Sequence, residues 1–201
     1  MNKEDIRNFL ESFAPKRERT IVIVDFGNVE KWKENLNWRV GIQELAKLVK
    51  RLSGRKFLRR FYYGADYGSN EDSIILTPWS KSILNRAKIN DFEVVDKRVK
   101  YIHDNHNQYG FQKKCDLDVE IAIDLIQERD NYDTIFIFSG DGDLVRAIQY
   151  LRENYDKECF VFAARGHMGR EVMDAKTSHI IKDILYADDF EYRLNMDRFR
   201  R

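Results

Sequence analysis

The 201-residue sequence has few cysteines, few prolines, almost no net charge and no long apolar run. Its two cysteines lie far apart and fit neither a disulfide framework nor a CxxC metal site, which favours reduced thiols in a cytoplasmic protein. No segment approaches the roughly 18 apolar residues of a membrane span, and the charged N-terminus lacks the apolar centre of a signal peptide. The two prolines argue against long disordered linkers. Because the formal net charge is only +1, any basic surface must be local.

The chain does contain enough apolar material for the core of one α/β domain. Hydrophobic residues make up 43% of it and aromatic residues 13%. Short apolar runs alternate with segments of helical periodicity, which predicts a mostly parallel sheet with helices on both faces. The predicted strands are residues 20–24, 56–63, 92–95, 135–138 and 159–163. The predicted helices are residues 3–13, 42–52, 74–90 and 116–129, with another after residue 144.

We therefore expect a three-layer α/β/α sandwich built on a mostly parallel sheet of five or six strands. The expected strand order is 3-2-1-4-5, in which strands one and four are neighbours. In such folds, functional sites gather outside the carboxyl ends of the strands, where the strand order changes direction. Residues that directly follow strands one and four are therefore the first candidates for a functional site.

The most informative stretch is residues 134–148, TIFIFSGDGDLVRAI, in which a buried strand passes into a helix through one tight turn. The turn carries Asp141 and Asp143, and its glycines let the backbone bend. Asp143 stands where the cap of the following helix is expected. The first strand ends similarly, in Asp25, with Asn28 three residues later. In the expected strand order, Asp25 and Asp141 meet across the crevice between the two strands.

A third acid comes from the helix that precedes the fourth strand. Asp118 shares a face with apolar side chains of that helix, and a carboxylate on a core-facing side is costly unless it is paired or bound to a cation. Asp116 is expected to cap the helix. Asp124 lies on the polar side and is expected to be a solvent-facing or structural residue. Asp118 is thus the acid that could join Asp25 and Asp141 in a cluster.

The segment at residues 96–114 is basic and aromatic, and it predicts a loop or hairpin at the edge of the sheet. Such a segment can contact phosphates and stack bases, or it can be a solvated hairpin, and the sequence leaves both interpretations open. The candidate phosphate contacts are Lys97, Arg98, Lys100, Lys113, Lys114, and, after the fifth strand, Arg165 and Arg170. Trp32 and Trp38 are candidates for base stacking, although core packing is the simpler interpretation for both.

Three motifs together resemble those of the NYN branch of PIN-like nuclease domains. They are Val24-Asp25-x-x-Asn28, Lys114-x-x-x-Asp118-x-Glu120-x-x-x-Asp124 and Ser139-Gly140-Asp141-Gly142-Asp143. The resemblance implies a PIN-like fold and metal ligation by Asp25, Asp118 and Asp141. It implies further that Asp143 and Asn28 act as ligands, directly or through water. The family also tends to carry an aspartate at the position of Asp124, which conflicts with a solvent-facing role.

The resemblance also suggests how the chain is divided. We expect an N-terminal helical extension at residues 1–19, an NYN/PIN-like nuclease domain at residues 20–187 and a C-terminal helical tail at residues 188–201. The apolar faces of the two terminal segments are compatible with a homodimer.

The chemistry that follows is metal-dependent hydrolysis of RNA. Converging carboxylates repel one another and raise one another's pKa values unless a cation relieves the repulsion. A ligand set made only of oxygens favours Mg²⁺ or Mn²⁺. Together with this chemistry, the resemblance implies an endoribonuclease that hydrolyses phosphodiester bonds of single-stranded or structured RNA. Because the three motifs contain no histidine, a histidine-based mechanism is not supported.

Five other classes of protein can be compared with the sequence. An RNA-binding or regulatory domain with little or no turnover would keep the same acids. A phosphatase of the haloacid-dehalogenase type would want a second aspartate two residues after Asp25, where Gly27 stands. A nucleotide-binding Rossmann protein would need the GxGxxG or GxxxxGK[ST] pattern, and neither occurs at the required place. In a purely structural module, the acids would be caps and turn residues. A receiver-type domain would need an acceptor aspartate after the third strand, where Asp96 lies nearby.

Overall fold

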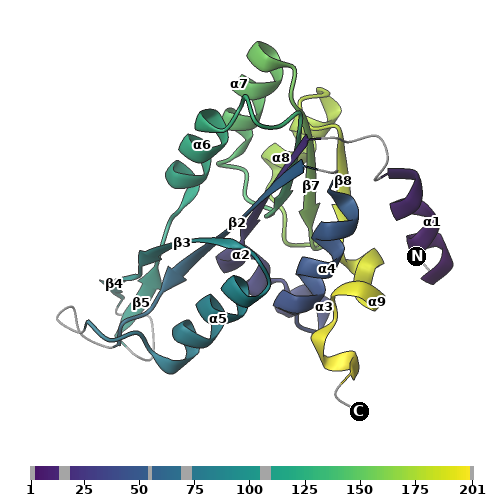
Figure 1. The fold of residues 1–201 in the computed structure, drawn as a ribbon. Helices are drawn as coiled ribbons and strands as arrows, with labels where there is room; N and C mark the ends of the chain where they lie inside the picture. The colour runs from purple at the N-terminus through teal and green to yellow at the C-terminus, as the bar shows by residue number, and fades with distance from the viewer. Residues whose placement is uncertain (1–2, 14–18, 54–55, 69–73, 105–109, 200–201) are drawn as a thin grey trace.

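Six parallel strands form the central sheet of the computed structural model, which describes residues 3–13, 19–53, 56–68, 74–104 and 110–199 (Figure 1). The strands are β1 (Arg19–Asp25), β2 (Lys56–Ala65), β3 (Glu93–Arg98), β6 (Thr134–Phe138), β7 (Glu158–Ala163) and β8 (Asp183–Tyr186). Their order is β3-β2-β1-β6-β7-β8. This confirms the predicted α/β class and the predicted order of the first five strands. The sixth strand, β8, was not located from the sequence, because only Ile184 and Leu185 mark it as apolar.

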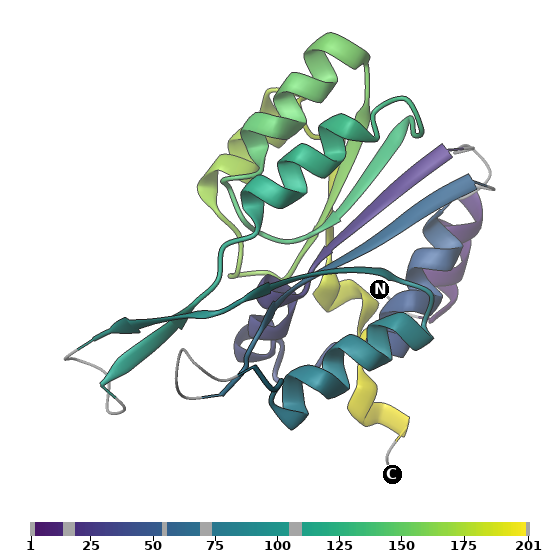
Figure 2. The same ribbon diagram turned by 60° about the vertical axis from the view of Figure 1, so that its left-hand side comes forward.

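Helices cover both faces of the sheet. One face carries α1 (Lys3–Phe13), α2 (Phe26–Lys31), α3 (Lys33–Leu36), α4 (Ile42–Leu52), α5 (Pro78–Ile89) and α9 (Glu191–Leu194). The other carries α6 (Asp118–Gln127), α7 (Val145–Tyr155) and α8 (Arg170–Thr177) (Figure 2). Two 3₁₀ turns, η2 (Ala187–Phe190) and η3 (Met196–Phe199), flank α9. The described part of the chain holds no helix that is both long enough and apolar enough to span a bilayer.

The alternation of side chains along β1 explains why the sheet is buried on both sides. Val22 and Val24 belong to the core beneath α4, whereas Ile21 and Ile23 belong to the core beneath α6 and α7. All four side chains are completely buried. Because both faces of this parallel strand are covered, these four successive residues along it are all apolar.

Two helices begin later than their periodicity predicted. The predicted helix at residues 74–90 begins at Pro78, because the side chain of Thr77 accepts a hydrogen bond from the backbone N–H of Ser80 and proline suits the first helical position. The predicted helix at residues 116–129 begins at Asp118. The capping position is held by Thr77 in α5 and by Leu117, which makes no side-chain capping bond, in α6.

The basic segment forms an antiparallel hairpin of β4 (Lys100–His103) and β5 (Phe111–Lys114), which projects away from the main sheet (Figure 2). The rings of Tyr101 and Phe111 pack against each other with their centroids 5.1 Å apart. Parts of three predicted segments lie outside the described residues. They are residues 1–2 and 14–18 of the N-terminal extension, residues 105–109 of the basic segment and residues 200–201 of the tail.

Candidate active site

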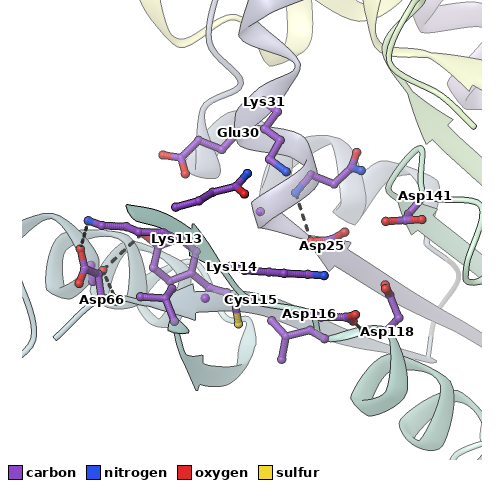
Figure 3. Close-up of a pocket in the computed structure, with 18 of the residues that line it drawn as sticks. Asp25, Glu30, Lys31, Asp66, Lys113, Lys114, Cys115, Asp116, Asp118 and Asp141 are labelled. Atoms are coloured by element: carbon purple, nitrogen blue, oxygen red, sulfur yellow. Dashed lines mark hydrogen bonds and ion pairs between the residues drawn. The ribbon is translucent and has the colours of Figure 1, made fainter. Parts of the chain in front are cut away.

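A pocket of about 670 Å³ opens beside the carboxyl ends of β1 and β2 and the turn that follows β6 (Figure 3). Its walls carry the side chains of seven acids and three lysines. The acids are Asp25, Glu30, Asp66, Asp116, Asp118, Asp141 and Asp143, and the lysines are Lys31, Lys113 and Lys114. This excess of negative charge, at the place where α/β folds bind ligands, suits a pocket that holds a cation.

Three of these acids converge most closely. Asp118 opens α6, Asp141 and Asp143 lie in the turn after β6, and each offers a carboxylate oxygen within 4.8 Å of the other two. That spacing is about twice the metal–oxygen distance of 2.0–2.6 Å found for Mg²⁺ and Ca²⁺. The structure thus brings together Asp118 and Asp141, both expected from the sequence, and adds Asp143 to the closest group.

Asp25 lines the same pocket, and hydrogen bonds fix the direction of its carboxylate. One oxygen accepts the backbone N–H of Asn28 at 3.2 Å, and the other accepts the hydroxyl of Ser139 at 3.0 Å. Burial, followed by the negative charge of Asp141, raises the pKa of Asp25 despite these two bonds. Each carboxylate oxygen keeps a second lone pair. Asp25 therefore caps α2 and can still face a cation beside Asp141.

The side-chain oxygen of Asn28 links α2 to the turn that follows β6. Its side-chain oxygen accepts the indole N–H of Trp32 at 2.9 Å and the backbone N–H of Gly140 at 3.0 Å. An amide oxygen has two lone pairs, and both are used here. The arrangement favours a positioning role for Asn28 over the ligand role that the resemblance implied.

The proton affinity of Asp118 reflects its crowded surroundings. Burial first, and then the hydrogen bond with Asp116 and the charges of Asp141 and Asp25, raise the pKa of Asp118 to about 7. Asp116 also accepts the backbone N–H of Asp118 at 3.1 Å, but Leu117 occupies the capping position of α6, so the capping role expected of Asp116 was wrong. Burial and repulsion by neighbouring acids together raise the pKa of a carboxyl group in this way when no cation is bound.

Asp143 does not cap a helix, contrary to the sequence interpretation. The following helix, α7, begins only at Val145, and Leu144 occupies its capping position. The backbone N–H of Asp143 instead donates to the carboxylate of Asp141 at 3.0 Å. Its side chain is exposed and does not cap a helix, so it can take part in the cluster with Asp118 and Asp141.

Asp124 stands away from the pocket and has a structural role. Its carboxylate accepts the hydroxyl of Tyr62 at 2.6 Å and lies 3.1 Å from the guanidinium of Arg60. The solvent-facing interpretation of Asp124 was therefore wrong, and these contacts support the structural one. The amphipathic pattern missed this contact because Arg60 and Tyr62 lie on β2, which only the tertiary fold brings against α6.

Most of the cations suggested for phosphate contact have acidic or aromatic neighbours. Lys97 pairs with Glu120, Lys113 with Asp66, Arg165 with Asp189 and Arg170 with Asp174, and Arg98 lies over the ring of Tyr67. Lys100 is exposed on the hairpin. Lys114 points from β5 toward the acids (Figure 3). It is the lysine of this set best placed for a phosphate bound beside them.

Neither tryptophan suggested for base stacking lines the pocket. Trp32 is completely buried, and Trp38 packs against the core. Trp79, which drew no notice in the sequence, lines the pocket and is 56% exposed. Its position after Thr77 and Pro78, at the start of a helix that follows β2, is the one sequence signal that could have placed it at the carboxyl edge of the sheet.

The parallel sheet and the acids at its carboxyl edge define a PIN-like domain of the nuclease type. The chain belongs to the NYN domain family, whose family model matches residues 19–185. This confirms the resemblance carried by the three motifs. The crystal structure of a protein of unknown function from Vibrio parahaemolyticus has the same fold, with a TM-score of 0.64, 20% identity and coverage of 86% of this chain and 94% of that chain.

One curated relative is the low amplitude and bright protein LabA of Synechococcus elongatus. It is 36% identical to this chain over 89 residues, which are 44% of this chain and 47% of the relative. The chain thus spans about half the length of the curated relative that it matches.

Proposed function

We propose that the protein is a metal-dependent ribonuclease that hydrolyses RNA phosphodiester bonds. The observation that carries the proposal is the convergence of Asp118, Asp141 and Asp143 within 4.8 Å, in a pocket that Asp25 also lines. The choice of RNA rests on membership of the NYN family. The choice of Mg²⁺ or Mn²⁺ rests on a donor set made of carboxylate oxygens.

The acids of the site would have different roles toward the proposed ion. Asp141 and Asp118 are the central ligands of the proposed ion, with Asp25 and Asp143 beside them, directly or through water. When bound, the ion would polarise the phosphate and activate a water molecule for attack. Asp118 would complete the site or help to position the attacking water. Asn28 and Ser139 keep Asp25 and the turn in register, since they bind both strand ends.

The substrate-binding surface is proposed on the hairpin side of the pocket. Lys114 is the direct phosphate contact, since it points toward the acids (Figure 3). Lys100, Lys97, Arg98 and Lys113 extend this surface along β4, β5 and the end of β3. Arg165 and Arg170 are weaker candidates, because each lies beside an aspartate of its own.

The division of the chain into residues 1–19, 20–187 and 188–201, a cytoplasmic location and a homodimer also stay proposals. Ile6 and Leu10 of α1 and Leu194 of α9 are buried in the core beside α4. This packing supports terminal segments that are integral to the folded unit.

The decisive experiment is cleavage of labelled RNA by the purified protein. Single-stranded, hairpin and circular RNAs are incubated with Mn²⁺ or Mg²⁺, and each reaction is repeated with excess EDTA. We expect cleavage that EDTA abolishes, including cleavage of the circular RNA, which has no ends for an exonuclease. Asp141→Asn should lose nearly all activity while keeping the circular dichroism spectrum of the folded protein.

Asp156→Asn is the matched control, because Asp156 is 92% exposed at the end of α7 and asparagine tolerates its left-handed backbone. It should cleave like the wild type. Equal activity of Asp141→Asn, or full activity in EDTA, would contradict the proposal. Binding of RNA without cleavage in both metals would favour a regulatory RNA-binding domain instead.

A further inference from the structure

Trp79 presents an indole ring to solvent at the rim of the acid pocket. It is 56% exposed, whereas Trp32 is completely buried. The ring lies where two pockets adjoin, because Trp79 and Glu30 line both the acid pocket and a second pocket of about 560 Å³. The exposed ring offers a large flat aromatic surface to a ligand at the edge of the acid pocket.

The backbone beneath Trp79 is held firmly. The backbone N–H of Thr77 donates to the carbonyl of Asp66 at 2.8 Å, and the backbone N–H of Asp66 donates to the hydroxyl of Ser80 at 2.9 Å. These bonds tie the first turn of α5 to the end of β2. The ring is therefore exposed on a fixed support, as a stacking platform requires.

The second pocket offers a path onward from the acids. Lys33 of α3 and Arg86 of α5 line it together with Trp79. Arg39 lines it as well, although this guanidinium pairs with Asp197. A nucleic-acid strand that leaves the acid pocket across Trp79 would thus bring its next phosphates toward Lys33 and Arg86. Aromatic rings next to cations are the usual elements of a single-strand binding groove.

We infer that Trp79 stacks on an unpaired base of the substrate, one or more nucleotides from the phosphate that is cut, and so selects single-stranded RNA or loops. This inference rests on the proposed ribonuclease function and adds the substrate class. A base inside a duplex is stacked on both faces, so it cannot lie on the indole without being extruded. Single-stranded RNA should therefore be cut with a lower KM than a duplex of the same sequence.

The test is cleavage kinetics with Trp79→Ala, Trp79→Phe and Ile89→Ala. Ile89 is a matched control, because it is an 80% exposed apolar residue at the other end of the same helix. Base–aromatic stacking predicts a rise in KM of roughly 5- to 100-fold for Trp79→Ala with a small change in kcat. The Trp79→Phe variant should recover most of the loss, and Ile89→Ala should match the wild type.

A set of RNAs with one abasic nucleotide at successive positions makes the test specific. In the wild type, one position should raise KM as much as Trp79→Ala does. In Trp79→Ala, the same abasic position should add nothing further, because the stacking partner is already gone. A structural role for Trp79 would instead raise KM equally for every RNA.

A binding measurement separates this inference from the proposed function. In the Asp141→Asn background with Mg²⁺, a single-stranded oligonucleotide should quench tryptophan fluorescence, and Trp79→Phe should remove most of that quenching. An unchanged KM, no coupling to an abasic position and unchanged quenching would each overturn the role of Trp79. Failure of the wild type to cleave any RNA would overturn the ribonuclease proposal. The fluorescence quenching alone would then show whether Trp79 stacks on a base.

Discussion

The side-chain oxygen of Asn28 accepts the backbone N–H of Gly140 at 3.0 Å, across 112 residues of sequence. This bond joins the residues that follow β1 to the turn that follows β6. The same oxygen also accepts the indole N–H of Trp32. One amide group thus holds the two halves of the acid site together.

Replacing Asn28 tests this coupling. Asn28→Ala leaves the N–H groups of Gly140 and buried Trp32 without their acceptor, and each unsatisfied donor costs about 1–3 kcal/mol. We expect thermal unfolding at a clearly lower temperature and a weaker stabilisation by Mn²⁺, since Asp141 would lose its fixed position. Asn85→Ala, at an exposed position of α5, should change neither. A normal response of Asn28→Ala to Mn²⁺ would contradict the positioning role.

Gly140 and Gly142 should differ in their tolerance of alanine. A Cβ atom at Gly140 would lie 2.2 Å from the carbonyl oxygen of His167, which is backbone and cannot move aside cheaply. At Gly142, the nearest atoms belong to the side chain of Glu171, at 2.6 Å and beyond. Overpacking of this kind costs about 1–3 kcal/mol. In chemical denaturation, the loss of unfolding free energy should lie at the upper end of this range for Gly140→Ala and at the lower end for Gly142→Ala.

The double variant Gly142→Ala with Glu171→Ala provides the control, because it removes the side chain that the new methyl group would meet. It should recover stability relative to Gly142→Ala alone. Equal losses for the two single variants would show that the backbone at His167 yields as easily as a side chain.

Asp124→Asn should separate stability from activity. The substitution keeps an acceptor for Tyr62 but removes the charge that faces Arg60, whose side chain is only 10% exposed. Breaking one partner of such a network costs about 1–3 kcal/mol. We expect a lower unfolding temperature with nearly unchanged RNA cleavage per folded molecule. Asp118→Asn should instead lose RNA cleavage without a lower unfolding temperature. Loss of cleavage in folded Asp124→Asn would place Asp124 in the active site.

The metal-free protein should lose stability as pH rises from about 4 to about 7. The pKa of Asp118 is raised to about 7 in the folded chain from its ordinary 3.8, so the folded state holds a proton that the unfolded state has released. A pKa that is raised in the folded state stabilises the folded protein at pH values below the pKa of the unfolded chain. That stabilisation disappears as pH rises through the pKa of the folded chain. Unfolding temperatures measured in EDTA across this range should fall, and the slope should be smaller in Asp118→Asn.

Adding Mn²⁺ should reverse this trend, because a metal ion competes with the proton for the same carboxylate. The rise in unfolding temperature on adding Mn²⁺ should be small at about pH 5 and larger at about pH 8. The same rise in Asp118→Asn as in the wild type at both pH values would remove Asp118 from the ligand set.

Local patterns in the sequence determined most of the fold and the neighbourhood of the site. Continuous apolar runs identified β1 and β6, and the rule that parallel strands present their carboxyl ends at one edge brought Asp25 and Asp141 together. The helical periodicity singled out Asp118, because it lies on the apolar side of its helix. All three residues line one pocket in the structure.

Only the tertiary structure decided the partners of these residues. The ion pair of Arg165 with Asp189, the hydrogen bonds of Asn28 to Trp32 and Gly140, and the exposure of Trp79 all depend on which elements pack together. Periodicity reports which way a side chain points along its own helix or strand, and it carries no information about the atoms that another element places opposite. The place where the acids gather could therefore be predicted from the sequence, whereas the contacts that each of these residues makes required the fold.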